Sequence, residues 1–365
     1  MYKIDCIVIG AGVVGLATAR ALALRGREVI IVEKNSMIGS ETSSRNNEVV
    51  HAGFLYPPDS LRGQLCRPGA ELLVEYCFDR GISLDFHGKL VLALAEEEEA
   101  VLETLLAFGR ANDVPGLKLL SADEVKEREH RISCRMALLS TNTAVVNSHD
   151  LMLSLQGDAE NAGAKLALNS TVVGGKGKVI TVENENGEPS DIEWATLVNA
   201  SGLGARDIVD HYTDERDNCS PNIRYAKGSY FNLTGKLPFS HLVVPLGKTL
   251  AAGGSFTIDP GGQGKFGPDL EWVTKQDYTV DPTKALTFAA AVGKYWDGLD
   301  EGRLQTGYAG VRPRTYGPED PTGDWLIETE AEHGVPGMVN LLGIETPGLT
   351  ASMAIAEYVA DKLKN

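Results

Sequence analysis

The alternation of apolar and polar residues is clearest at the start of the chain. Residues Asp5–Ile9 form a short apolar run typical of a buried strand, and Val29–Val32 form a second one. Between them, Val14–Leu24 has apolar residues at helical spacing and ends at Gly26. This order predicts a strand–helix–strand unit with two parallel strands.

The rest of the chain alternates between helical and strand-like patterns. Helical spacing recurs in five stretches: Leu61–Phe78, Glu96–Asn112, Ala122–Glu129, Ser148–Ala162 and Pro347–Leu363. Strands are predicted at Leu166–Leu168, Thr171–Val173, Val179–Glu183, Ile192–Trp194, Ala195–Asn199 and Val339–Leu342. From Tyr225 to about Gly323, short β-like runs alternate with loops rich in glycine and proline. The pattern predicts two interleaved domains, one of residues 1–80, 145–210 and 325–365 and one of residues 81–144 and 211–324.

Charge excludes some classes of partner. The 365 residues include 34 Lys and Arg against 50 Asp and Glu, a net charge of −16, and no basic run interrupts this excess. We therefore expect neither a nucleic acid nor an anionic membrane surface as partner. A small anionic substrate would need a local cationic pocket. No uninterrupted apolar segment reaches about 18 residues, so no membrane span is predicted.

The cysteines and histidines argue against a disulfide framework and against a metal site. The five cysteines are an odd number without a CxxC pair, which favours reduced thiols and a cytoplasmic location. The histidines show no HxxxH or similar spacing, so no metal is expected.

The first candidate site is the turn Gly10-x-Gly12-x-x-Gly15, which follows a strand and opens a helix. In a dinucleotide site, these glycines allow a tight turn, close approach of a pyrophosphate, and close packing of the helix on the strand. Glu33 ends the second strand, where a carboxylate accepts hydrogen bonds from ribose hydroxyls. The alternative is a glycine-rich turn without a ligand.

Three further stretches hold candidate functional residues, and each has a structural alternative. His51 follows the polar residues Ser43–Asn47 and is a candidate pocket histidine or an ordinary core histidine. Arg312, between Gly310 and Pro313, has the rigid setting of a carboxylate clamp but could equally be a surface arginine. The turn Gly343–Thr350 precedes a helix whose free N–H groups favour negative charge, although an ordinary helix cap would look the same.

Taken together, these motifs resemble the FAD-dependent oxidoreductases of the D-amino-acid oxidase/glycine oxidase superfamily, and within it the L-2-hydroxyglutarate oxidase/dehydrogenase-like branch. The resemblance covers nearly the whole chain, through IVIGAGVVGLATA, SSRNNEVVHAGFLYPPDSL, LVNASGLGA, KGSYF, GVRP and GIETPGLTAS. It implies an α/β fold in which a GR2-type, Rossmann-like FAD-binding domain (residues 1–80, 145–210 and 325–365) is interleaved with an antiparallel β-sheet substrate domain.

The resemblance also assigns site residues. It implies FAD contacts from Gly10, Gly12, Val14, Gly15, Glu33, Lys34, Ser44, Arg45, Asn46, Val172, Val173, Ala200, Gly202, Gly310, Gly343, Ile344, Gly348, Leu349 and Thr350. It implies catalytic or substrate-binding roles for His51, Arg312, Lys227 and Tyr230. Two positions depart from the branch: Ser255 stands where a pocket histidine is usual, and Glu48 stands where glycine is common.

The implied reaction is oxidation of a small 2-hydroxy acid, similar to 2-hydroxyglutarate, to the 2-oxo acid by hydride transfer to flavin N5. Neutral His51 would remove the hydroxyl proton, and kcat/KM would fall below about pH 6.5 as the imidazole gains a proton. Arg312, helped by Lys227, would hold the carboxylate. The electron acceptor stays open between oxygen, a quinone and a carrier flavoprotein. The alternatives are an FAD-dependent amino-acid or secondary-amine oxidase, a non-catalytic FAD-binding electron-transfer subunit, and an NAD-binding protein.

Overall fold

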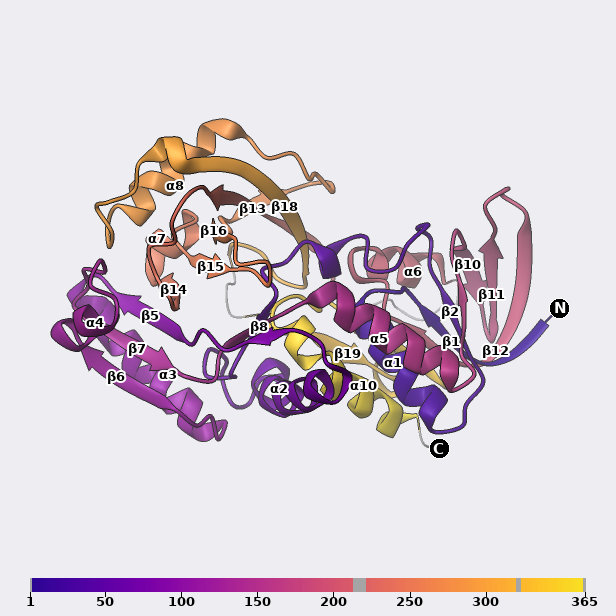
Figure 1. The fold of residues 1–365 in the computed structure, drawn as a ribbon. Coiled ribbons are helices and arrows are strands. Elements are labelled where there is room, and N and C mark those ends of the chain that lie inside the picture. Colours follow the sequence, from indigo (N-terminus) through magenta and orange to yellow (C-terminus); the bar gives the residue numbers. More distant parts are fainter. Residues whose placement is uncertain (1, 213–220, 320–322, 364–365) are drawn as a thin grey trace. The chain divides into compact units, whose positions relative to one another are not determined.

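The computed structural model describes residues 2–212, 221–319 and 323–363, so Cys219 lies outside the described part of the chain. The chain forms two compact units. The first comprises Met1–Ser44, Ser148–Tyr225 and Arg312–Asn365, and the second comprises Arg45–Asn147 and Ala226–Val311. Each unit is built around a large sheet of its own (Figure 1).

The first unit contains an eight-stranded sheet with the order β10-β11-β12-β1-β2-β9, in which β20 also pairs with β12 and β19 pairs with β20. The strands are β1 (Tyr2–Ile9), β2 (Val29–Val32), β9 (Lys165–Ala167), β10 (Thr171–Lys176), β11 (Val179–Glu183), β12 (Pro189–Asn199), β19 (Leu326–Glu328) and β20 (Met338–Leu342). The five strands β9, β2, β1, β12 and β20 run parallel. This parallel core confirms the predicted α/β fold, although the two strands expected within 192–199 form one continuous strand.

Helices pack on this sheet through small side chains. The helices are α1 (Val13–Leu24), α5 (Ser148–Asn161), α6 (Ala205–His211), α9 (Glu330–His333) and α10 (Gly348–Lys362). Helix α1 contacts β1 and β2 and also packs against α5 and α10 (Figure 1). The buried faces of α1 and α10 are rich in alanine. Small side chains let helices approach each other and the sheet closely, which brings α1 and α10 side by side.

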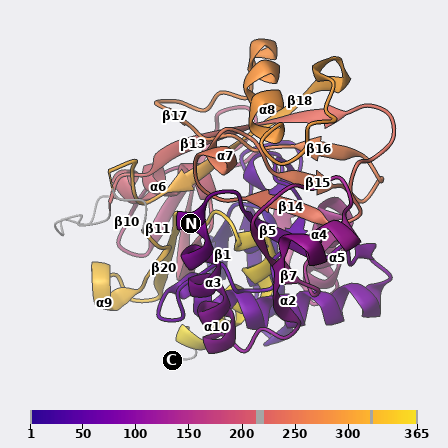
Figure 2. The same ribbon diagram turned by 90° about the vertical axis from the view of Figure 1, so that its left-hand side faces the viewer.

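The second unit contains a nine-stranded sheet with the order β17-β13-β16-β15-β14-β5-β7-β6, in which β18 also pairs with β13. Figure 2 shows β16, β15, β14 and β5 following one another across this sheet. The strands are β5 (Lys89–Ala93), β6 (Leu117–Ser121), β7 (Met136–Ser140), β13 (Arg224–Leu233), β14 (Leu242–Pro245), β15 (Phe256–Ile258), β16 (Gly264–Phe266), β17 (Glu271–Val273) and β18 (Leu304–Arg314). Most pairs are antiparallel, as predicted, but β14 and β5 run parallel.

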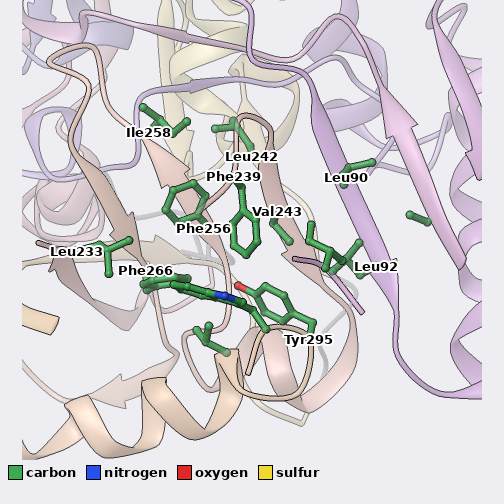
Figure 3. Close-up of a cluster of buried hydrophobic side chains, with 14 of the residues drawn as sticks. Leu90, Leu92, Leu233, Phe239, Leu242, Val243, Phe256, Ile258, Phe266 and Tyr295 are labelled. Atoms are coloured by element: carbon green, nitrogen blue, oxygen red, sulfur yellow. The ribbon is translucent and has the colours of Figure 1, made fainter. Parts of the chain in front are cut away.

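An aromatic core lies against this second sheet (Figure 3). The Phe239 ring lies 5.3 Å from the Phe256 ring and 5.4 Å from the Trp296 ring, both in edge-on geometry. The buried Tyr295 hydroxyl donates a 2.7 Å hydrogen bond to the Gly254 carbonyl, so the polar atom of this side chain has a partner. Buried aromatic side chains dominate core energetics, so this cluster holds the second sheet together.

The remaining elements of the second unit surround these strands. A small sheet has the order β3-β8-β4, formed by β3 (Val49–Val50), β8 (Ala144–Val146) and β4 (Leu84–Asp85). The helices are α2 (Leu61–Arg80), α3 (Glu99–Ala111), α4 (Ala122–Arg128), α7 (Gly247–Ala251) and α8 (Ala285–Val292). Short 3-10 turns complete the chain.

The units divide the chain at other points than the predicted domains do. Residues 45–80 group with the second unit, because α2 contacts β4 and the Cys66 thiol donates a 3.7 Å hydrogen bond to the His51 carbonyl. Of the described residues, 211–212, 221–225, 312–319 and 323–324 group with the first unit. The assignment of these segments to cofactor or substrate binding stays a prediction.

Candidate functional site

Three loops begin at one edge of the first unit's sheet. In the parallel register, Ile9 pairs with Asn199, and Asn199 pairs with Asn340. The carboxyl ends of β1, β12 and β20 therefore lie next to one another. This is the edge at which open parallel sheets bind ligands, and the loops that start there contain Gly10–Gly12, Ala200–Gly202 and Gly343–Pro347.

The glycines of the first loop are required by close packing. Gly10 has φ +101°, and a Cβ there would lie 2.6 Å from the Ala200 carbonyl oxygen. A Cβ at Gly15 would overlap the Gly10 carbonyl oxygen. A Cβ at Gly12 would meet only the Ser43 side chain, with the hydroxyl at 3.0 Å. Gly10 and Gly15 thus hold α1 against the loop, whereas Gly12 keeps the backbone accessible.

The N-terminus of α1 is prepared for an anion. Gly12 occupies the cap position and offers no side-chain hydrogen bond, and the first turn has no acidic residue. The Val13 N–H donates to the Ser43 hydroxyl at 3.0 Å. The other N–H groups of the first turn have no partner inside the helix and carry its positive potential. Ser43 belongs to the polar cluster Ser43–Asn47 that the sequence suggested near a pyrophosphate, although the resemblance implied a cofactor contact for Ser44 instead. Ser44 is exposed and bonds weakly to the Glu41 carbonyl.

Glu33 is buried, and its carboxylate anchors the first loop by a hydrogen bond to Ala11. Its carboxylate accepts hydrogen bonds from the Ala11 N–H (2.8 Å) and from the N–H and side-chain amide of Asn35 (both 2.9 Å). A carboxylate has about four acceptor positions, so one position remains for a ribose hydroxyl. Lys34 is exposed and pairs with Glu41 at 2.8 Å.

A hydrogen-bond network joins β12 to β20 beside the second loop. The Asn199 side chain donates to the Asn340 side chain (3.1 Å) and to the Ala205 carbonyl (2.9 Å), and it accepts from the Ser201 hydroxyl (2.6 Å). This network fixes the backbone around Ala200 and Gly202. At the other side of the sheet, the Ser170 N–H donates to the Glu33 carbonyl, which brings the start of β10, with the predicted Val172 and Val173, toward Glu33.

The third loop repeats the design of the first. Gly343 has φ +68°, and a Cβ there would lie 2.6 Å from the Thr315 side chain. Helix α10 begins at Gly348 without a side-chain cap and without an acidic residue in its first turn, and Thr350 is fully buried. Because α1 and α10 pack together, the unit has two neighbouring helices that each begin directly after this edge of the sheet.

Arg312 belongs to a buried charge cluster in the first unit. The Glu345 carboxylate, 3% exposed, lies 3.8 Å from the Arg312 guanidinium and 3.1 Å from that of Arg314. It also accepts a 2.6 Å hydrogen bond from the Tyr316 hydroxyl. Arg312 is thus held by a carboxylate of the chain itself, and Arg314 contacts the same carboxylate. Neither Glu345 nor Arg314 was predicted for the site.

His51 lies in the second unit and is buried. Its ring lies 6.1 Å from the Tyr56 ring, and its carbonyl accepts the Cys66 hydrogen bond. Burial lowers the pKa of His51 well below its usual range, and the nearby charge of Lys89 lowers that pKa further. The predicted role of His51 as the base stays a prediction, and with this lowered pKa the expected fall in kcat/KM moves to a pH below about 6.5. Lys89 was not predicted for the site.

The other candidates of the second unit are already partnered. Lys227 is buried and pairs with Asp277, whose pKa this hydrogen bond lowers. The Tyr230 ring stacks on the Tyr308 ring with a centroid distance of 4.6 Å. The charge of Lys227 is thus balanced inside the unit, which leaves it less available for a substrate carboxylate than predicted.

Residues Arg45, Asn46 and Gly310 lie together in the second unit. The Arg45 guanidinium lies 4.4 Å from the centre of the Tyr278 ring, and Asn46 accepts a hydrogen bond from the Tyr308 hydroxyl through its carbonyl. A Cβ at Gly310 would overlap the Arg45 carbonyl oxygen. Gly310 is therefore explained by close packing of β18 on residue 45.

The two departures from the resembled branch have a structural counterpart. Glu48 has φ +60°, a left-handed conformation in which glycine is favoured, and the Asn46 side chain supports it by accepting the Glu48 N–H at 2.6 Å. Ser255 is buried, and its hydroxyl has no hydrogen-bond partner within the described residues. A buried hydroxyl without a partner is typical of a position that meets water or a ligand.

Comparison with known proteins gives the family. The sequence model of the family described as "FAD dependent oxidoreductase" matches residues 5–362. The chain belongs to this family of FAD-dependent oxidoreductases. It is 39% identical over 402 aligned residues to the mitochondrial L-2-hydroxyglutarate dehydrogenase of Arabidopsis thaliana, covering 99% of this chain and 83% of the relative.

Solved structures share the fold of this oxidoreductase. The L-α-glycerophosphate oxidase of Mycoplasma pneumoniae, solved with FAD bound, superposes with a TM-score of 0.89 at 23% identity and covers 100% of this chain and 96% of its own. Glycine oxidase from Geobacillus kaustophilus superposes with a TM-score of 0.80 at 20% identity, covering 100% and 95%.

The geometry of the first unit fits the cofactor of this oxidoreductase. FAD is an extended anion with a ribose diol, and the unit offers an uncapped helix N-terminus, a loop kept open at Gly12, and one free acceptor position on Glu33. The Gly343–Thr350 loop supplies a second uncapped helix start, and its contact with the flavin stays a prediction. FAD accepts a hydride when bound in this family of enzymes.

Two further findings concern the oxidoreductase outside these loops. Across residues 2–212, 221–319 and 323–363, no cluster of three or more His, Cys, Asp or Glu side chains is arranged to hold a metal ion. In the same residues, no helix has both the length and the apolar character needed to cross a membrane.

Proposed function

We propose that the protein oxidises a small 2-hydroxy acid, similar to L-2-hydroxyglutarate, to the corresponding 2-oxo acid with FAD as hydride acceptor. The observation that carries this proposal is the 39% identity to a plant L-2-hydroxyglutarate dehydrogenase over 99% of the chain. Identity spread over the whole chain includes the second unit, which holds most of the residues predicted to bind substrate.

His51 acts as the base in this proposal. Oxidation breaks the C2–H bond and the O–H bond of the C2 hydroxyl. The C2–H electron pair would leave with the hydride that FAD accepts, the proton would pass to the imidazole, and the O–H electron pair would form the C2=O double bond. A hydroxyl proton is not acidic at neutral pH, so a positioned base is needed. Burial and the charge of Lys89 keep His51 neutral and able to accept that proton.

Arg312 binds a substrate carboxylate in this proposal. Its guanidinium has a planar donor face for a bidentate pair, and Glu345, 3.8 Å away, orients it. Tyr230 and Lys227 take supporting roles, since Tyr230 is fixed by its stack on Tyr308 and Lys227 by Asp277.

The decisive experiment is anaerobic reduction of the bound flavin, followed by its absorbance. We expect rapid bleaching by L-2-hydroxyglutarate and slow or no bleaching by glycine, proline or glutamate at equal concentration. Faster bleaching by an amine would place the protein among the amine oxidases, and faster bleaching by glycerol 3-phosphate would place it among the oxidases of phosphorylated alcohols. A flavin that none of these compounds reduces would indicate a non-catalytic FAD-binding subunit.

The location and electron acceptor complete the proposal. A cytoplasmic location is supported by the free thiols of Cys6, Cys66, Cys77 and Cys134, which suit a reducing compartment. The plant relative's own name describes it as mitochondrial. Reoxidation of the reduced protein by oxygen, a soluble quinone or a carrier flavoprotein, measured at equal concentrations, would identify the acceptor class.

A further inference from the structure

Lys89 is the first residue of β5 and lies on the face of that strand that meets the His51 segment. Side chains alternate between the two faces of a strand. Val91 and Ala93, two and four residues later, pack in one cluster with Ala52 and Phe54, which directly follow His51. Leu90 and Leu92 pack in the aromatic core on the opposite face. The alternation therefore directs the Lys89 side chain toward the segment that begins at His51.

The ammonium of Lys89 has no counter-charge. The residue is 3% exposed, and in the described part of the chain its Nζ has no hydrogen bond and no ion pair. The other buried lysines of the unit are partnered: Lys227 pairs with Asp277, and Lys265 lies 3.5 Å from Asp259 and 3.4 Å from the Tyr308 hydroxyl. A buried charge is normally paired because its desolvation is costly. The exception at Lys89 points to a ligand that brings the negative charge.

The groups around Lys89 do not supply that charge. His51 is neutral over a wide pH range, since burial lowers its pKa. Burial raises the pKa of the Cys66 thiol to about 12, so this group is neutral as well. Burial lowers the pKa of Lys89 to about 8, which still leaves the ammonium mostly protonated at pH 7. The cluster of Lys89, His51 and Cys66 is thus a buried site with one positive charge.

We propose that Lys89 binds a carboxylate of the substrate and that this makes the enzyme selective for dicarboxylic 2-hydroxy acids. The inference rests on the proposed function for the identity of the substrate. Charge balance supports it. Within the second unit, Lys89 carries one unbalanced positive charge beside His51. The second carboxylate of a dicarboxylic acid would neutralise this charge, whereas a monocarboxylic acid has no second carboxylate to do so.

The test compares the binding of two five-carbon acids, glutarate with two carboxylates and valerate with one. Neither has a hydroxyl group, so neither can be oxidised at C2. Dissociation constants are measured on the FAD-loaded protein from flavin absorbance, for wild type, Lys89→Met, Lys89→Gln and the control Lys284→Met. Lys284 is a lysine of the same unit that is already paired with Asp269 and Glu271. We expect Lys89→Met and Lys89→Gln to weaken glutarate about ten- to a hundredfold and valerate less than threefold, with no change for the control.

Thermal unfolding without a ligand separates this role from a structural one. Removal of an uncompensated buried charge should leave the Tm unchanged or raise it. A lowered Tm with equal weakening of both probes, or unchanged glutarate binding in both Lys89 variants, would overturn the inference.

Wild-type bleaching by L-2-hydroxyglutarate is recorded in parallel. If L-2-hydroxyglutarate bleaches the flavin but the Lys89 variants bind glutarate as the wild type does, the proposed function is retained and the role of Lys89 is rejected. If the Lys89 variants bind glutarate more weakly but L-2-hydroxyglutarate does not bleach the flavin, the role of Lys89 is retained and the proposed function is rejected.

Discussion

Glu33 offers a sharp test of how the first unit binds its cofactor, because its carboxylate has both an internal and an external role. In Glu33→Gln, the amide oxygen can replace only one of the two carboxylate oxygens. If it faces Asn35, both hydrogen bonds from Asn35 remain, but the Ala11 N–H then meets an NH₂ group. Ala11 is fully buried, so its N–H loses its acceptor without access to water. An unsatisfied buried donor costs about 1–3 kcal/mol.

The Glu33→Gln substitution should change two measurable quantities. The FAD-free protein should lose about 1–3 kcal/mol of stability, seen as a Tm lowered by a few degrees. Binding of FAD should weaken separately, since the charged acceptor for the ribose is gone. A hydrogen bond to a charged group contributes about 1.5–3 kcal/mol, or roughly a ten- to hundredfold change in Kd.

Asn35→Ala is the matched control for Glu33→Gln. It removes one donor to the carboxylate and leaves the charge and the Ala11 hydrogen bond in place. Its FAD Kd should stay within about threefold of wild type, a change worth under 1 kcal/mol. Glu33→Gln with wild-type Tm and wild-type FAD affinity would show that the carboxylate serves neither role, and our placement of the ribose would be wrong.

Three further outcomes are expected. Gly15→Ala should lose FAD and lower the Tm, because the new Cβ overlaps the Gly10 carbonyl. The control Gly157→Ala lies in the middle of α5 with open space around it and should be neutral or stabilising by up to about 1 kcal/mol. Flavin content and Tm are measured for both variants. His51→Asn should retain FAD but slow anaerobic bleaching by L-2-hydroxyglutarate roughly 10²–10⁴-fold. The kcat/KM of the wild type should fall only at a pH below the usual pKa of histidine, because protonation abolishes the function of the base and the pKa of His51 is lowered. A fall in kcat/KM that begins at or above pH 6.5 would contradict this. Arg312→Met should raise the KM for the substrate about a hundredfold, equal to roughly 3 kcal/mol, with unchanged flavin content, and a KM within a few-fold of wild type would exclude Arg312 as the clamp.

The strand–helix–strand start was predictable because its information is local. Periodicity defines β1, α1 and β2, and the positions of Gly10, Gly15 and Glu33 follow from the geometry of one turn. The structure bears out the packing constraints at both glycines, since each Cβ would collide with a backbone carbonyl. Likewise, the departure noted at Glu48 coincides with a positive φ of 60°.

The residues that could not be predicted from the sequence all depend on contacts between distant segments. Ser43 reaches Val13 across 30 positions, and Asn199 reaches Asn340 across 141. A strand pattern marks Lys89 only as a polar residue at the edge of an apolar run; its burial depends on the pairing of β5 with β14 and β7. Sequence spacing contains no information on these pairings. The polar cluster Ser43–Asn47 therefore did not single out Ser43, and no pattern pointed to Lys89.

Burial shifts the pKa values of His51 and Lys89 in the same direction, yet it leaves them in opposite charge states at neutral pH. Desolvation disfavours the charged form of both groups. For His51, which starts near 6.5, the shift makes the neutral form dominant well into the acidic range. For Lys89, whose usual pKa is near 10.5, burial lowers the pKa only to about 8, so the ammonium keeps its charge at pH 7.

The net charge of the chain is −16, so long-range attraction cannot draw an anion to the protein. A charge in a low-dielectric site acts most strongly at short range. One buried cluster can therefore hold a neutral proton acceptor beside an anion-binding ammonium, which are the two functions that oxidation of a hydroxy acid requires.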